Sequence, residues 1–113
     1  MKLTIETESG GSYADADEET IRRLVDQLSP ENSYLILQRD DVDDGYAQTA
    51  IARTPDGNHI EGRYVIEYHK GQRTHFQAFT ENTDVVHNVL AGWAFDRADW
   101  KSLLEWTELA FEL

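Results

Sequence analysis

Four aspartates within six residues are the most concentrated chemical groups in the chain. They lie in the run Asp40-Asp41-Val42-Asp43-Asp44-Gly45, and carboxylates before a turn glycine are typical of calcium-binding loops. The spacing contradicts a calcium loop. With Gly45 at the sixth position, Val42 falls at the third and Ile51 at the twelfth, where oxygen ligands are needed. The sequence therefore predicts no metal site here.

Two interpretations of this acidic loop remain open. It is either a hairpin loop whose carboxylates stay in water, or a docking site that steers a cationic surface into contact. The second interpretation makes the four aspartates of the loop the candidate partner-binding residues: Asp40, Asp41, Asp43 and Asp44. Lesser candidates for the same role are Asp56, Trp106 and Glu108.

Histidines are the other residues that could do chemistry. His59, His69 and His75 fall in neighbouring predicted strands, and the predicted pairing sets His75 opposite Glu67, which could orient the imidazole as a base. No second carboxylate, serine nucleophile or spaced ligand pair accompanies them. The chain also lacks a phosphate-binding loop, a dinucleotide-binding glycine motif, a nucleophile elbow and a zinc-protease motif. We therefore predict no catalytic residues and no cofactor.

Composition limits the classes of partner. The 113 residues carry a net charge of −12, which argues against direct binding to nucleic acid or to an anionic membrane and predicts a basic protein as partner. The chain has no cysteine, which suits a reducing cytoplasm. Neither a signal-peptide pattern nor a run of 18 apolar residues is present, so we expect a cytoplasmic protein with no membrane contact.

Residue periodicity predicts the elements that position these groups. We expect one α+β domain over residues 1–113, in which an antiparallel meander of about five to six strands packs against two main helices, in the order β-α-β-β-β-β-α-β. The predicted strands are a short one at Leu3 and Ile5, then 34–39, 46–53, 59–69, 74–79 and a last one in the tail from Thr107. The helices are predicted from apolar stripes, one of Ile21, Leu24, Val25 and Leu28, the other of Val86, Val89, Leu90 and Trp93.

Turn positions predict the strand register. A three-residue loop at Pro55-Asp56-Gly57 would set Thr54 opposite Asn58 and Gln48 opposite Tyr64. A loop over residues 70–72 would set Phe76 opposite Ile66 and His75 opposite Glu67. The three tryptophans, Trp93, Trp100 and Trp106, are expected mainly in the core, with Trp106 the least certain of the three because it lies on the same side of the tail as Glu108.

The C-terminal segment carries a resemblance to a known family. Leu104-Glu105-Trp106-Thr107-Glu108-Leu109 follows an amphipathic helix, and this ending, with the order of elements, resembles that of bacterial polymorphic-toxin immunity proteins. Residues 96–104 lack the proline that the family typically carries before the tryptophan. The resemblance implies a cytoplasmic antidote that binds one cognate toxin, often a nuclease or a nucleic-acid deaminase, and blocks its active site or substrate groove.

The sequence thus leads to an immunity or inhibitor protein that binds a basic toxin. The charge and the C-terminal resemblance support this hypothesis, since toxins that act on nucleic acids need basic surfaces. Two alternatives remain: an acidic nucleic-acid mimic or regulatory adaptor that binds a basic protein, and a small enzyme that uses His75 and Glu67.

Overall fold

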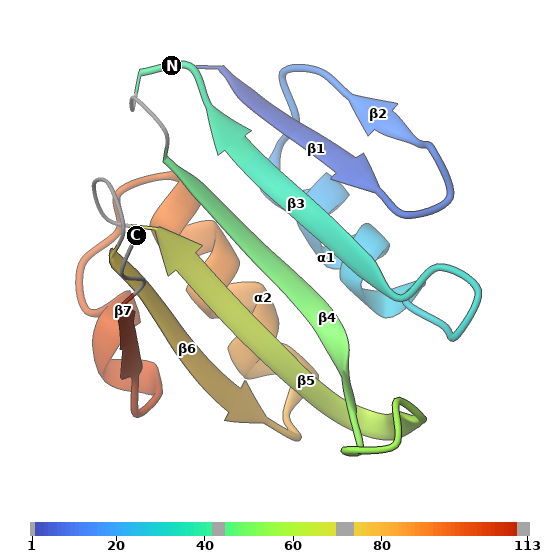
Figure 1. Cartoon of the computed structure of the whole chain (residues 1–113). Helices are drawn as coiled ribbons and strands as arrows, with labels where there is room; N and C mark the ends of the chain where they lie inside the picture. Colours follow the sequence, from blue (N-terminus) through green and yellow to red (C-terminus); the bar gives the residue numbers. More distant parts are fainter. Residues whose placement is uncertain (1, 42–44, 70–73, 111–113) are drawn as a thin grey trace.

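The computed structural model describes residues 2–41, 45–69 and 74–110. Within these residues, seven strands form one antiparallel sheet in the order β2-β1-β3-β4-β5-β6-β7 (Figure 1). The strands are β1 (Leu3–Thr7), β2 (Ser12–Tyr13), β3 (Tyr34–Arg39), β4 (Tyr46–Arg53), β5 (His59–His69), β6 (Thr74–Thr80) and β7 (Thr107–Ala110). The predicted α+β class with an antiparallel meander is confirmed, and the two-residue β2 is an additional strand.

Two α-helices and a short 3₁₀ helix cover one face of this sheet, behind the strands in Figure 1: α1 (Glu18–Asp26), α2 (Thr83–Ala94) and η1 (Trp100–Leu103). Both α-helices are preceded by a residue type that favours the N-cap position. The Asp17 side chain accepts a hydrogen bond from the Thr20 amide at 2.9 Å, and Asn82 caps α2 in the same way.

Alternation along the strands decides which side chains meet the helices. In β3, Leu35 and Leu37 are fully buried, and Ile66 of β5 lies opposite Thr49 of β4 within the same buried layer. These residues share one core with the apolar stripes of α1 and α2. His87, which its sequence position marks as an ordinary boundary residue, is buried on α2, where its Nε2 lies 2.9 Å from Asp26 Oδ1 of α1.

The predicted register of β4 on β5 is correct at the hairpin and wrong beyond it. The Thr54 amide donates to the Asn58 carbonyl and Arg53 pairs with His59, as a three-residue loop requires. The next pair is Ile51 with Tyr64, because residues 60–63 form a bulge opposite one residue of β4. The bulge includes Gly62 at φ +79°, a conformation that glycine tolerates.

This bulge changes which face of β4 meets the core. The shift is an odd number of residues, and an odd shift turns a strand's side chains to the opposite face. Gln48 therefore pairs with Glu67 rather than with Tyr64, and it lies on the face away from the helices.

The predicted pairing of β5 with β6 is wrong by two residues. Phe76 lies opposite Tyr68, and Ala78 opposite Ile66. An even shift preserves the faces, so Ala78 is still buried in the core as expected. It does change the cross-strand neighbours, and His75 now lies opposite His69 instead of Glu67.

Candidate binding face

The face of the sheet away from the helices carries side chains in three rows that run across the strands. We call it the open face, since no helix among the described residues covers it. The first row is apolar and joins four strands: Tyr34, Ala50, Val65 and Phe79 are consecutive cross-strand partners. Tyr34 is 38% exposed and Phe79 is 48% exposed, so the row presents two large aromatic side chains to solvent.

The second row is a polar ladder centred on Glu67. One oxygen of its carboxylate accepts a hydrogen bond from Gln48 Nε2 at 2.6 Å, and the other accepts one from Gln77 Nε2 at 2.8 Å. Both amide groups are therefore oriented by one carboxylate. The ladder places a fixed negative charge near the middle of the open face.

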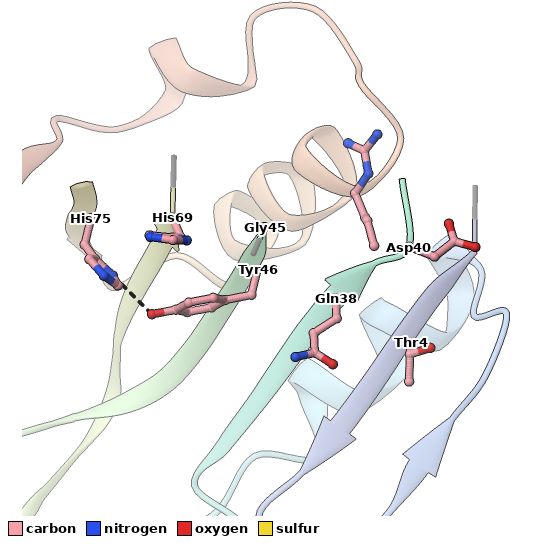
Figure 2. Close-up of a pocket in the computed structure, with 8 residues that line it drawn as sticks. Thr4, Gln38, Asp40, Gly45, Tyr46, His69 and His75 are labelled. Atoms are coloured by element: carbon pink, nitrogen blue, oxygen red, sulfur yellow. Dashed lines mark hydrogen bonds between the residues drawn. The ribbon is translucent and has the colours of Figure 1, made fainter. Parts of the chain in front are cut away.

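The third row lines a recess at the end of the sheet that carries the acidic loop. Thr4, Gln38, Tyr46, His69 and His75 succeed one another from β1 to β6 (Figure 2). The Tyr46 ring stacks on His69 with centroids 5.5 Å apart, and its hydroxyl lies 3.1 Å from His75 Nδ1. Burial, with a smaller effect from the Glu67 charge, raises the pKa of Tyr46 above its usual value. The phenol therefore stays neutral at physiological pH.

This recess has a volume of about 640 Å³, and its remaining lining residues are Arg39, Asp40 and Gly45. Figure 2 shows Asp40 and Thr4 on one side of the recess, Tyr46 and the two imidazoles on the other, and Gln38 between them. Asp40 is exposed, and its Oδ1 accepts a hydrogen bond from the Lys2 amide at 2.7 Å. One predicted partner-binding residue thus lies at the edge of the open face.

Asp41, the next residue of the acidic loop, is held by Arg39. The Arg39 side chain is buried on the helix side of the sheet, and its Nε and Nη2 donate to the two oxygens of Asp41 at 3.0 and 2.7 Å. Both oxygens of Asp41 are therefore bound within the protein, which gives this residue a structural role. Asp43 and Asp44 lie outside the described residues.

Arg39 has an acceptor for each of its five N–H groups. Besides Asp41, it donates to both oxygens of Asp96 at 2.8 and 2.9 Å and to the Trp93 carbonyl at 2.9 Å. These bonds favour the charged forms, so the pKa of Arg39 is raised and those of Asp41 and Asp96 are lowered. The network ties the end of β3 to the C-terminal end of α2.

The lesser candidates lie apart from one another. Asp56 is exposed in the β4–β5 hairpin turn, and Glu108 is exposed on the edge strand β7 opposite Phe76. Trp106 is partly buried against the core. Its ring meets Tyr68 edge-on with centroids 4.8 Å apart, and its Nε1 donates to the Lys101 carbonyl at 2.9 Å. Trp106 therefore has a structural role.

The residues of the enzyme alternative are not arranged as predicted. Glu67 contacts Gln48 and Gln77, whereas His75 contacts Tyr46 and His69. The pairing that motivated a catalytic base is therefore wrong. Among the described residues, no group of three or more His, Cys, Asp or Glu side chains could hold a metal ion.

Sequence reasoning missed Arg39 and Tyr46. Arg39 could have been found, because it continues the inward alternation of Leu35 and Leu37, and a buried arginine needs carboxylate partners. Tyr46 could not, because its face depends on the bulge in β5.

Comparison with known proteins assigns no family and no function to the chain. No protein-family model, curated protein or solved structure matches the chain. In the part of the chain that the structure describes, neither helix is long and apolar enough to cross a membrane.

Proposed function

We propose that this protein is a binding protein, an immunity protein that neutralises a basic toxin of the nuclease or deaminase class. The observation that carries the proposal is the open face, a broad sheet surface with exposed aromatic side chains and a central carboxylate on a chain of net charge −12. Exposed aromatic residues are typical of the anchors of protein interfaces.

The size of the open face limits how the partner docks. Strands lie about 4.8 Å apart, so β1, β3, β4, β5 and β6 span about 24 Å, and six residues along a strand span about 20 Å. The resulting area of about 500 Å² is smaller than the roughly 800 Å² that each partner buries in a standard interface. The partner therefore also contacts the rim, where Asp40 and Asp56 supply acceptors for basic side chains.

The proposed mode of action is occlusion without turnover. Toxins that act on nucleic acids need a basic substrate groove, and an acidic protein seated over it excludes the substrate by charge and by shape. The site of action is the cytoplasm, where such a toxin would meet its substrates.

The direct test is co-expression with the product of the adjacent gene, followed by purification of the complex and measurement of affinity at two salt concentrations. The expected result is one tight, stoichiometric basic partner whose toxicity disappears on binding. Several weak, salt-labile basic partners that compete with DNA would instead support the nucleic-acid mimic. A partner that is bound but remains toxic would exclude the immunity role.

Matched variants locate the interface. Phe79→Thr on the open face should weaken the complex at least tenfold, because exposed aromatic anchors carry a large share of binding energy. Glu19→Gln on α1 changes an exposed acid on the covered side and should leave the affinity unchanged. Equal effects of the two variants would contradict binding through the open face.

A further inference from the structure

The recess of about 640 Å³ at the acidic-loop end of the open face is lined by groups of different chemistry, and together they suit one kind of ligand. Its lining combines a carboxylate, Asp40, with the neutral acceptor of Gln38, the aromatic ring of Tyr46 and two imidazoles. This volume falls within the range of about 300–1,000 Å³ that is usual for ligand sites. The volume is larger than that of one side chain, so the recess can admit a side chain of a partner together with part of the loop that carries it.

Among the described residues, Asp40 keeps one acceptor free at the edge of the recess. Asp40 Oδ1 accepts from the Lys2 amide, while Oδ2 has no hydrogen-bond partner among the described residues. Gln38 is exposed, and its cross-strand neighbours are Thr4 and Tyr46. The recess therefore offers a carboxylate on one side, an amide oxygen in the middle and an aromatic ring on the other side (Figure 2).

Arg39, a cationic residue of the recess lining, does not occupy these acceptors. Its five N–H groups are taken by Asp41, Asp96 and the Trp93 carbonyl. One guanidinium is thus paired with two carboxylates, so this group of described residues carries a net negative charge and Arg39 offers no competing donor.

We propose that this recess binds a single arginine side chain of the protein partner. A planar guanidinium can lie over the Tyr46 ring and donate to Gln38, its cross-strand neighbour, while the Asp40 carboxylate on the other side of the recess attracts its charge; an ammonium group offers no plane and no fork. The hydrogen bond between the Tyr46 hydroxyl and His75 holds the ring in place before the ligand arrives. This inference rests on the proposed function and names the group by which the basic partner is recognised.

The test uses the isolated, ¹⁵N-labelled full chain and two small probes, N-acetyl-argininamide and N-acetyl-lysinamide. The arginine probe should cause saturable NMR shift changes at Gln38, Asp40 and Tyr46, and the lysine probe should bind several-fold more weakly. No saturable change at these residues, or equal binding of the two probes, would overturn the proposal.

Variants of the recess sharpen this test. Tyr46→Leu and Asp40→Asn should each weaken the arginine probe about two- to fivefold, the size expected for an exposed cation–π contact or charge pair. Tyr46→Phe keeps the ring but loses the hydrogen bond to His75, so it should bind the arginine probe more tightly than Tyr46→Leu does, provided that its dispersed spectrum shows an intact fold. Tyr34→Leu and Asp56→Asn change the same residue types outside the recess and should leave the affinity for the arginine probe unchanged. If Tyr34→Leu weakened the probe as much as Tyr46→Leu, or Asp56→Asn as much as Asp40→Asn, the assignment of the recess would be contradicted.

Failure of this inference differs from failure of the immunity role. If the arginine probe binds but the co-expressed toxin does not, the recess stands and the immunity role falls. If the toxin is bound and neutralised, and Tyr46→Leu and Asp40→Asn leave its affinity unchanged, the immunity role stands and the arginine recess falls.

Discussion

The covered and open faces of the sheet differ in what their side chains contact. On the covered face, alternate residues such as Leu37 and Ile66 are buried against α1 and α2, so each one fills a volume that the core needs. On the open face, Gln48, Glu67 and Gln77 contact one another and remain partly exposed. Folding constrains the first set strongly and the second set weakly, so the proposed binding function can be tested on the open face with little effect on folding.

Arg39 is the exception that links the two faces. It is a charged residue on the covered side, next in sequence to Asp40 on the open side, and its network fixes where the acidic loop begins. A buried charge is retained only with partners, and here the partners also position the rim of the recess.

Arg39→Met should cause the largest loss of stability outside the apolar core. The substitution removes the bonds to Asp41 and Asp96, whose carboxylates are exposed and become hydrated, and it leaves the Trp93 carbonyl unpaired, which costs about 1–3 kcal/mol for a buried acceptor. Urea unfolding measures the change. Arg39→Lys keeps the charge without the fork and should recover part of the loss. A variant as stable as the wild type would show that the covered face tolerates loss of this charge.

The second prediction concerns close packing on the covered side. Gly92→Ala should destabilise the protein by about 1–2 kcal/mol, although alanine favours helices by about 1 kcal/mol over glycine. The reason is that a β-carbon at Gly92 would lie 2.2 Å from the Trp100 β-carbon. Asn88→Ala, at an exposed position one turn earlier in α2, should raise stability instead. If the two variants unfold at the same temperature, the clash with Trp100 must be relieved by a movement of η1 away from α2 that costs little stability.

The fold was predictable because its signals are local. Apolar alternation at Leu35 and Leu37 predicts a strand, and the stripe from Val86 to Trp93 predicts a helix that must cover it. The register of β4 on β5 was not predictable from turn chemistry alone, since the bulge over residues 60–63 changes it after a correct hairpin. A two-residue strand such as β2 also leaves no periodic signal.

The candidate site was predictable only in part, because a site depends on neighbours across strands. The acidic loop and the histidines were visible as residue types, but the bulge decides that Tyr46 joins His69 and His75 on the open face. Asp40 and Asp41 are adjacent in sequence and were given one role. In the structure Asp41 is bound to Arg39, while Asp40 borders the recess.

The third prediction concerns the pH dependence of the stability that the Arg39 network contributes. Arg39 lowers the pKa of Asp41 and of Asp96 below their ordinary value of 3.8, so the folded state binds fewer protons than the unfolded state. The stability from these pairs is present above pH 3.8 and is lost as the pH falls through the lowered values.

Urea unfolding of the wild type and of Arg39→Met should therefore converge as the pH is lowered from 6 toward 3. Glu8, whose pKa is also lowered through hydrogen bonds from Ser33, is common to both proteins and cancels in the difference. A difference that stays constant over this range would mean that Arg39 acts through packing rather than through charge.

The smallest effect on stability is expected on the open face, in a comparison within one strand. Phe79 and Ala78 are neighbours in β6, but Phe79 is 48% exposed and Ala78 only 2% exposed. Phe79→Thr keeps a side chain that favours strands and should change the free energy of unfolding by about 0.5 kcal/mol or less. Ala78→Thr adds the same side chain to the packed layer beside Ile66 and should cost about 1–3 kcal/mol.

Affinity for the proposed protein partner should show the reverse order for these two variants, when each is measured at a temperature where it is folded. Phe79→Thr removes an exposed aromatic anchor and should weaken the complex, whereas Ala78→Thr leaves the open face unchanged. If Phe79→Thr lowers stability as much as Ala78→Thr does, the exposed aromatic row serves folding, and its presence on the open face no longer argues for a partner there.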